Sequence, residues 1–471
     1  MLRTTTFITI ALASTGAMAN TLDQYLDQVK NQNKSYQSAD LQMKGSVLRR
    51  READLFFKPQ FFFNAQKGHD SRLPSPPFLV FDEVKTENYS AGITQEFSFG
   101  VETKLSYSLI KSEYKGLSIA GAADPYWDAS PSLEINIPLW GNAFGNASKA
   151  RKEQTLQQRN LENRNAEAQA KETLVQAEIA YWRLAIAQES VEVQKKALTA
   201  ADNIHNYTVG RKNKNLGEAA DVLQANALTE SYRLQLTQAE IDERAARRKY
   251  NLHLNQEADA PVPMLSKLNY KNLSGDVVPT ARPGDRPDVK ASQAQVALAR
   301  ASSQLSIEQN KPTLNLFGGY SLFGRNGERR DAISQAGYDH RDSAYVGVKF
   351  NMPLNVMAQN DARAGAAQVQ RAAELSNQYL AYSQEQEWVD LSSLYKDAQQ
   401  SLKLAEAMER AQKAKLDNER TRLRQGRTTT YQVLLFEQDF LNSEVSRIRA
   451  ASQIINLKSQ IQLYSSTEEG K

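Results

Sequence analysis

The chain has 471 residues, a formal net charge of +4 and no cysteine. The absence of cysteine excludes disulfides, thiolate catalysis, cysteine-based metal sites and a lipidated-cysteine anchor. The small net charge, with both signs interspersed, leaves no electrostatic footprint for nucleic-acid binding.

The first nineteen residues predict a secretory signal peptide. Arg3 precedes an apolar run at residues 7–13, and Ala17-Met18-Ala19 supplies an A-x-A cleavage site. A buried N-terminal helix is the alternative interpretation. We expect the mature chain to start near Asn20, outside the cytoplasm. Beyond it, no run approaches about 18 consecutive apolar residues, so the sequence predicts no transmembrane helix.

The rest of the sequence consists of two similar halves, marked by three pairs of matching motifs. A repeat of this length predicts that each half builds the same structural unit. The pairs are Asn136-Ile137-Pro138-Leu139 with Asn351-Met352-Pro353-Leu354, Val222-Leu223 with Val433-Leu434, and Lys58-Pro59 with Lys311-Pro312.

Strand-like segments precede the long helices in each half. At residues 101–109, 132–139, 314–322 and 345–352, apolar and polar side chains alternate. Alternating strands of about ten residues fit a transmembrane β-barrel that is apolar outside and polar inside. A soluble β-sandwich shows the same alternation, but the signal peptide and the long helices that follow favour the barrel.

Long helices are predicted by two proline-free segments, residues 139–260 and 354–471, which are rich in Ala, Gln, Glu, Lys and Arg. Within residues 174–204, two adjacent apolar seams predict packing against a neighbour on each side, as in a wall or cylinder; a four-helix bundle is the alternative. The first seam is Leu174, Ala177, Tyr181, Leu184, Val191 and Leu198, and the second is Val175, Ile179, Trp182, Ile186, Val193, Ala200 and Ile204.

Helix lengths predict how these segments are arranged. The descending helices, residues 138–215 and 353–426, each have more than seventy residues and therefore a length of roughly 110 Å. The returning segment at 222–256 covers only about 50 Å, and residues 286–311 supply about 40 Å more. Each returning helix is therefore predicted to be two stacked pieces, with the linker 261–285 at mid-height.

These features together resemble the TolC family of outer-membrane efflux proteins, over essentially the whole chain after the signal peptide. The resemblance rests on the duplicated helix–hairpin–helix plan, on Arg286-Pro287-Asp288 at the start of the second repeat, and on two turn motifs. The turns are Asn215-Leu216-Gly217-Glu218-Ala219-Ala220-Asp221-Val222-Leu223 and Gly426-Arg427-Thr428-Thr429-Thr430-Tyr431-Gln432-Val433-Leu434.

The resemblance implies an α+β membrane protein. Its strands would form a trimeric outer-membrane β-barrel, continued by a long periplasmic α-helical barrel. It further implies the exit duct of a tripartite efflux system, without enzymatic activity or cofactor, whose partners are a periplasmic adaptor protein, an inner-membrane pump and outer-membrane lipid. One chain also has too few strands to close a water-filled barrel, which independently predicts oligomerisation. A duct for type I protein secretion and a periplasmic coiled-coil scaffold are the alternatives.

In the family, the two helix–helix turns form the periplasmic tip, which is both the closed gate and the docking surface for the adaptor. An acid in the first turn pairs there with a base in the second. Asp221 matches the acid. Thr428 occupies the position of the base, Arg427 lies one place before it, and Arg424 is a rival partner.

Asp221 has a plainer alternative role as the N-cap of the following helix, and the two roles are compatible. Some family members carry an acidic ring in the second turn, but Gln432 and Leu435 stand at those places here. The predicted gate and docking residues are Asn215, Gly217, Asp221, Arg424, Gly426, Arg427, Thr428 and Gln432.

The first β region, residues 59–138, is much longer than its counterpart at 312–353. Its extra strand-like segments at 89–99 and 101–110 are either part of a long extracellular loop or an additional hairpin that enlarges the barrel. Pro74-Ser75-Pro76-Pro77 predicts an exposed loop.

The sequence predicts no catalytic or metal site. Its four histidines, His69, His205, His253 and His340, lack metal-ligand spacing and nucleophile motifs. His69-Asp70 and Tyr338-Asp339-His340 are expected in hairpin loops, and Gly318-Gly319 is expected inside a strand, where glycine permits close packing or bending.

The predicted organisation is a signal peptide at 1–19, an upper helix at 20–58, barrel strands and extracellular loops at 59–138, long helices at 139–260 with a turn near 211–222, a linker at 261–285, a second upper helix at 286–311, a β-hairpin at 312–353, long helices at 354–463 with a turn near 424–434, and a C-terminal tail at 464–471.

Overall fold

The computed structural model describes residues 21–72, 82–116, 125–266, 273, 275, 281–338 and 341–464. The predicted signal peptide, the proline-rich loop at 74–77, Asp339 and His340 lie outside the described residues. So do much of the predicted linker and all but the first residue of the C-terminal tail.

The chain divides into two compact units. A helical unit comprises Met1–Met43, Arg164–Lys290 and Leu380–Lys471. A sheet unit comprises Lys44–Asn163 and Ala291–Tyr379.

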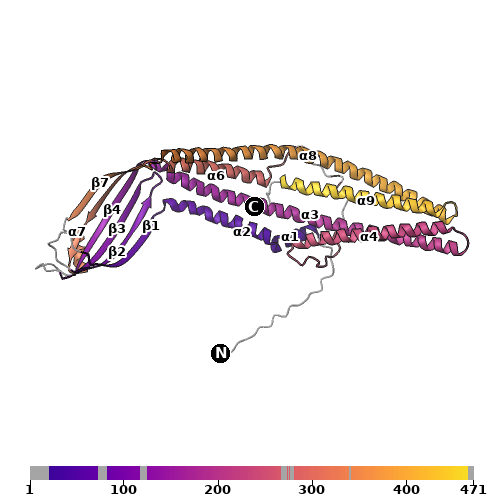
Figure 1. Ribbon diagram of the computed structural model, residues 1–471, viewed down its shortest axis with the longest axis horizontal. Coiled ribbons are helices and arrows are strands. Elements are labelled where there is room, and N and C mark those ends of the chain that lie inside the picture. The colour runs from indigo at the N-terminus through magenta and orange to yellow at the C-terminus, as the bar shows by residue number, and fades with distance from the viewer. Residues whose placement is uncertain are drawn as a thin grey trace, which may run out of the picture. The chain divides into compact units, whose positions relative to one another are not determined.

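The two longest helices are continuous over 68 and 69 residues, as the proline-free segments predicted (Figure 1). Each is followed by a short turn and a returning helix. The helices are α1 Leu22–Gln32, α2 Lys34–Arg49, α3 Asn146–Asn213, α4 Ala219–His253, α6 Pro287–Gln309, α7 Arg329–Tyr338, α8 Val356–Arg424 and α9 Thr430–Ile461, with short 3₁₀ turns at Arg50–Phe57, Ala143–Gly145 and Gln462–Tyr464.

Two buried clusters of the helical unit confirm that α3 packs on two sides. Its first seam supplies Tyr181 and Leu184 to a cluster with Tyr25 of α1 and Tyr250 of α4. The rings of Tyr25 and Tyr250 are stacked with centroids 4.2 Å apart, and the Tyr25 hydroxyl donates to the Tyr250 carbonyl at 3.2 Å. The end of α4 therefore packs against α1 rather than continuing as one helix.

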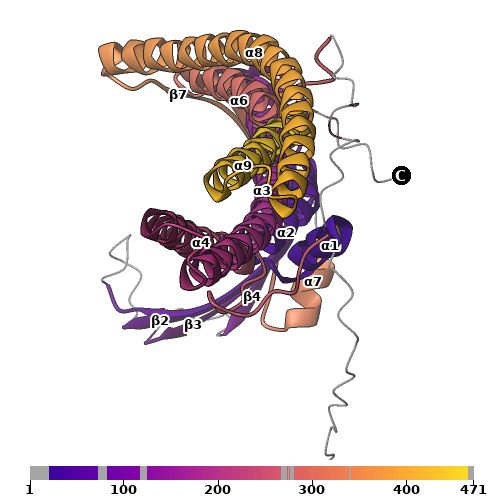
Figure 2. The same cartoon turned by 90° about the vertical axis from the view of Figure 1, so that its right-hand side faces the viewer.

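The second seam of α3 faces the other hairpin. Trp182 and Ile186 pack against a cluster of α8 and α9 that includes Trp388, Tyr395 and Ile454. Further along, a smaller cluster joins α3, α4 and α9. The α3–α4 and α8–α9 hairpins thus lie side by side, as Figure 2 shows from the end.

The Arg286-Pro287-Asp288 motif opens α6, with proline at the first helical position where its missing N–H is not needed. The Arg286 guanidinium pairs with Asp288 at 2.7 Å and with Glu387 of α8. It also lies over the ring of Tyr464, 5.9 Å from its centroid. The motif therefore ties the start of α6 to α8 and to the end of the described chain.

The sheet unit contains one antiparallel sheet of seven strands, in which six neighbours follow the order β1-β2-β3-β4-β5-β7 and β6 pairs with β4. The described residues form one sheet and not the two packed sheets of a sandwich. The strands are β1 Gln60–Asp70, β2 Glu83–Glu96, β3 Glu102–Lys115, β4 Tyr126–Trp140, β5 Thr313–Leu322, β6 Gly324–Asn326 and β7 Asp342–Asn351.

The strand-like segments at 89–99 and 101–110 of the first β region are strands of this sheet and belong to β2 and β3. The expectation that His69 and Asp70 lie in a hairpin loop is wrong: both belong to β1 and pair with Lys85 and Val84. Gly318 and Gly319 do lie inside β5, where the ring of Tyr345 covers the space that a Cβ of Gly319 would need.

The second β region is more than a hairpin. Between β5 and β7 the chain forms the short strand β6 and the helix α7. Ala332 and Ala336 of α7 are buried against Ala129, Tyr107 and Leu109 of the sheet. Their small side chains allow this close approach, which the short polar sequence of α7 did not reveal.

The two faces of the sheet differ in polarity. Successive residues of a strand point to opposite faces, so the alternation of apolar and polar residues places the apolar side chains on one face and the polar ones on the other. The apolar face contains the paired row Phe61, Ile93, Leu105, Leu133 and Tyr320. The polar face contains the row Asn64, Ser90, Ser108 and Ser130, and the serines 106, 132 and 321.

Candidate gate at the two helical turns

The turn between α3 and α4 is closed by backbone hydrogen bonds around a left-handed residue. The Leu216 N–H donates to the Arg211 carbonyl at 2.9 Å, and Asn215 has φ +57°. Asparagine tolerates this conformation better than most residues, which explains its place here. The Arg211 guanidinium donates to the Leu216 carbonyl at 2.7 Å and so braces the turn.

The turn between α8 and α9 repeats this geometry. The Arg427 N–H donates to the Arg422 carbonyl at 2.9 Å, and Gly426 has φ +72°. Glycine meets no steric penalty at such an angle. The second turn thus superposes on the first in its hydrogen-bond pattern, residue by residue.

This common pattern sets the correspondence between the predicted gate residues of the two repeats. Asn215 corresponds to Gly426, Gly217 to Thr428 and Asp221 to Gln432. Both Asp221 and Gln432 stand at the third position of their helices, α4 and α9.

The N-cap interpretation of Asp221 is wrong. The N-cap of α4 is Glu218, whose backbone is extended at φ −90° and ψ 153° and whose side chain makes no capping hydrogen bond. Asp221 lies inside the first turn, where its charge meets the positive end of the helix dipole. In the second repeat Thr429 is the N-cap and accepts from the Gln432 N–H at 3.3 Å.

Within the described part of the single chain, Asp221 forms no ion pair with Arg424 or Arg427. Arg424 donates to the Thr421 hydroxyl at 3.2 Å on its own helix, and Arg427 is exposed on the turn. The single chain therefore brings the predicted residues to the same end of two neighbouring hairpins without joining the acid to a base.

A buried carboxylate that the sequence analysis missed closes the second turn. Glu419 of α8 is only 4% exposed. It accepts a hydrogen bond from the Thr428 hydroxyl across the turn and pairs with Arg422 at 3.2 Å. Nothing in the local sequence distinguishes Glu419 from its exposed acidic neighbours, because only the turn brings Thr428 to it.

The first turn has no such link. The position that corresponds to Glu419 is Thr208, whose hydroxyl donates to the His205 carbonyl of its own helix at 2.7 Å. The position that corresponds to Thr428 is Gly217, which has no side chain. The two turns therefore share a backbone and differ in how side chains hold it.

Further from the turn, two ion pairs join α8 to α9. Arg420 contacts the buried Glu437 at 2.5 Å, and Lys415 contacts Asp439 at 3.1 Å. In the described residues no ion pair joins α3 to α4 at the corresponding level. The α8–α9 hairpin is thus the more strongly cross-linked of the two near its tip.

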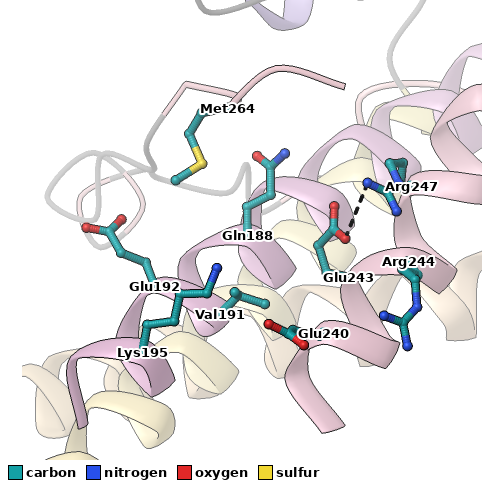
Figure 3. A pocket seen from close by; sticks show the side chains of 9 residues that line it. All are labelled: Gln188, Val191, Glu192, Lys195, Glu240, Glu243, Arg244, Arg247 and Met264. Atoms are coloured by element: carbon teal, nitrogen blue, oxygen red, sulfur yellow. Dashed lines mark ion pairs between the residues drawn. The ribbon is translucent and has the colours of Figure 1, made fainter. Parts of the chain in front are cut away.

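A cavity of about 430 Å³ lies between α3, α4 and the chain after α4 (Figure 3). Its wall carries three carboxylates and three cationic groups, so it has no net preference for either charge. Arg247 lies 3.9 Å from Glu243, and Gln188 binds the backbone of Pro263 and Leu265. The cavity marks where the chain leaving α4 crosses α3.

Among the described residues, no group of three or more His, Asp or Glu side chains is arranged to hold a metal ion. In the same part of the chain, no helix has the length and apolar content needed to cross a membrane.

No protein-family model matches the sequence, and no curated protein matches it significantly. Solved structures do match. CusC, described for its transmembrane channel formation, superposes with a TM-score of 0.67 at 13% identity over 97% of this chain and 96% of its own. The MtrE outer-membrane channel of Neisseria gonorrhoeae matches with 0.65 at 15% identity, over 94% and 88%.

The CmeC outer-membrane channel of Campylobacter jejuni matches with a TM-score of 0.63 at 13% identity, over 100% of this chain and 95% of its own. At such low identity these matches establish the fold, and they cover nearly the full length of both partners. The chain therefore has the fold of the TolC-type outer-membrane channels, as the resemblance in its sequence predicted.

Proposed function

We propose that the protein is an outer-membrane channel that serves as the exit duct of a tripartite efflux system. It passes small molecules from an inner-membrane pump and the periplasm to the exterior. The fold shared with outer-membrane channels over nearly the whole chain is the observation that carries this proposal.

The apolar face of the sheet supports a place in the outer membrane. Phe61 is 73% exposed, Leu105 57% and Val348 63% in the single chain. An apolar surface of this extent is costly in water and is stabilised in contact with lipid tails. The helices would then extend into the periplasm.

The edges of the sheet support a homotrimer. In the described residues, β1 and β7 each pair on one side only. A membrane-spanning sheet has to satisfy every backbone group within protein, because lipid tails offer no hydrogen bonds. Pairing β1 of one copy with β7 of the next would close the sheet into one shared barrel.

We further propose that the two turns form the periplasmic gate and the docking surface for an adaptor. Asp221 would pair with Arg424 or Arg427 of a neighbouring copy, since all three lie at the same end of their hairpins and the single chain leaves them unjoined. Exposed backbone around Asn215, Gly217 and Gly426 would present the turns to the adaptor, with Thr428 and Gln432 beside them.

Purification of the full chain from outer membranes, followed by native mass spectrometry and planar-bilayer recording, tests the proposal. We expect a trimer that forms an ion-conducting channel. A monomer without conductance, or a protein that extracts into the soluble fraction without detergent, would overturn it in favour of the coiled-coil scaffold.

A duct for type I protein secretion remains the second candidate within the same fold. Cross-linking from cysteines placed at Gly217 and Gly426 would capture the adaptor, and the pump associated with that adaptor separates drug efflux from protein secretion. The chain lacks native cysteines, so these would be its only thiols.

A further inference from the structure

We infer that the inserted hairpin β2–β3 is part of the channel wall, so that three chains form an outer-membrane barrel of eighteen strands with a wide, polar bore. This inference rests on the proposed trimeric channel and adds its width and its selectivity. It is argued from three features of the sheet unit: the pairing of β2 and β3, the place of their turn, and the character of their two faces.

The pairing of β2 and β3 is as complete as that of the other strands. β2 pairs with β1 through eleven residues, from Gln60↔Thr94 to Asp70↔Val84. β2 and β3 are paired along their full 14 residues. β3 in turn pairs with β4 from Glu102↔Asn136 to Ser112↔Tyr126. The hairpin therefore lies between β1 and β4 in the sheet, as Figure 1 shows.

Side chains on the polar face fix the register of the insertion. The ring of Phe62 on β1 fills the space above Gly92 of β2, where any Cβ would lie 2.7 Å from it. Lys104 of β3 lies 5.9 Å from the centroid of the same ring and pairs with Glu134 of β4 at 3.1 Å. Contacts thus run without a break from β1 through β2 and β3 to β4.

The turn of the hairpin is held at the end of the sheet where α3 begins. Gly100, with φ +92°, lies so close to Asn142 and Gly145 that a Cβ would meet their backbone at 2.7–2.8 Å. Glu96 accepts a hydrogen bond from Ser148 of α3, and Gln95 donates to the Phe57 carbonyl at 2.7 Å. A hairpin that belonged to an extracellular loop would have no reason to be fixed at this end.

The two faces of β2 and β3 continue those of the neighbouring strands. On the apolar face, in the half of the hairpin nearer α3, Tyr89, Ile93 and Leu105 are exposed in the single chain, as lipid-facing side chains of a barrel would be. In the other half the same face carries the ion pairs Lys67–Glu87 and Lys115–Glu83, so the apolar band covers only part of each strand. On the opposite face stand serines, of which Ser106 lies 2.7 Å from Ser132 of β4. This alternation is what a wall strand requires and an extracellular flap does not.

The strand count sets the width of the barrel. With strands about 4.8 Å apart and tilted by about 40°, each strand adds roughly 6.3 Å to the circumference. Six wall strands from each of three chains give a backbone diameter of about 36 Å, whereas a wall without β2 and β3 would have twelve strands and about 24 Å.

The chemistry of the bore follows from the polar face. Its paired rows are mostly uncharged hydroxyl and amide side chains, but they also include Lys104 and the carboxylates Glu96, Glu102, Asp128 and Glu134. Lys104 pairs with Glu134 and Arg325 pairs with Asp128, which offsets two of the four carboxylates. The barrel would therefore admit bulky hydrophilic solutes and select chiefly by size.

Single cysteines on paired positions of β3 and β4 test the inference, because the native chain has no thiol. The variants are Leu105→Cys and Ser106→Cys on β3, with Leu133→Cys and Ser132→Cys on β4 as the matched controls at the paired positions. The full-length protein in liposomes is treated with a charged, water-soluble maleimide. We expect positions 106 and 132 to react and positions 105 and 133 to react about tenfold more slowly, because lipid excludes the reagent.

Equal labelling at 105 and 106, with the contrast between 132 and 133 retained, would overturn the inference and leave the proposed channel intact. Equal labelling at all four positions would instead show that the sheet is not in lipid, so that the proposed function itself fails. These two failures are therefore distinguishable.

The width is measured on the unmodified protein with polyethylene glycols of graded size added to the extracellular side of a bilayer. A twelve-stranded wall has a backbone radius of about 12 Å, whereas an eighteen-stranded wall has about 18 Å. We therefore expect polymers with hydrodynamic radii somewhat above about 12 Å to enter the mouth and lower the conductance. Exclusion of every polymer above that radius would overturn the eighteen-stranded barrel.

Discussion

Replacing Glu419 with alanine is expected to loosen the α8–α9 turn and leave the α3–α4 turn unchanged. The substitution removes the acceptor of the Thr428 hydroxyl and the partner of Arg422. Because Glu419 is buried and the two turns share one backbone pattern, the first turn serves as a reference within the same molecule.

The magnitude follows from the two contacts. A hydrogen bond to a charged acceptor contributes about 1.5–3 kcal/mol to local stability. The Arg422 pair adds at most about 0.5 kcal/mol, because the arginine side chain is 51% exposed and its charge is screened. Together they predict a local loss of about 2–3 kcal/mol, which corresponds to about 30- to 150-fold more frequent opening.

Amide hydrogen exchange on the purified protein measures this opening directly. The Gly426 and Arg427 amides, which donate across the second turn, should exchange faster by that factor in Glu419→Ala. The Leu216 amide of the first turn should be unaffected. Glu419→Gln keeps an acceptor for Thr428 and should accelerate exchange by less than about tenfold.

Unchanged exchange at Arg427 in Glu419→Ala would refute the role assigned to the buried carboxylate. Equal acceleration at Leu216 would show that the substitution acts on the whole tip and not on one turn.

Three further predictions concern the gate, the core and pH. If the Asp221 carboxylate pairs with an arginine of a neighbouring copy, Asp221→Ala should raise the conductance of the isolated channel, whereas Asp221→Glu should keep it low. Equal conductance in the unmodified protein and both variants would show that Asp221 is a surface charge without a role in the gate. Tyr25→Ala should lower the free energy of unfolding, measured by chemical denaturation, by about 3–5 kcal/mol, because loss of the buried ring leaves a cavity between α1 and α4. Tyr25→Phe removes only the hydrogen bond to the Tyr250 carbonyl and should lower it by about 1 kcal/mol. A small effect of the alanine variant would place α1 outside the core. Burial, with a smaller effect of Lys249, lowers the pKa of His253 from its usual 6.5. The neutral His253 therefore contributes fully to stability above pH 6.5, and this contribution is lost as the pH falls toward the lowered pKa. Between pH 7 and pH 5, His253→Gln should lose less stability than the unmodified protein, and an identical pH profile of the two proteins would contradict this.

Much of the fold was predictable because it depends on local rules. Proline-free runs predicted α3 and α8, since proline is incompatible with a helix interior, and each run is broken only at its turn, by Asn215 and Gly217 or by Gly426. The two seams of α3 predicted neighbours on both sides, and Tyr181 belongs to the cluster with α1 and α4 while Ile186 packs against the cluster of α8 and α9. Period-two alternation found β3, β4, β5 and β7 in the same way.

Other features escaped prediction for physical reasons. Helix α7 is short and polar, and its alanines become a packing surface only where β4 is present. The N-cap of α4 fell on Glu218 and not on Asp221, because the backbone of the turn decides which residue stays extended. Glu419 has no local signature, since its partner Thr428 lies nine residues away across the turn.

The sequence by itself determined the duplicated plan, the long helices, the alternating strands and the resemblance to outer-membrane channels, because periodicity and proline placement act within short windows. Tertiary structure alone decided that β2 and β3 separate β1 from β4, since strand neighbours are set by pairing between segments distant in sequence. It also decided that two turns with the same backbone are held differently, one by a buried glutamate and the other by backbone and Arg211 alone among the contacts described. Contacts of that kind depend on where folding brings side chains together, which no local pattern encodes.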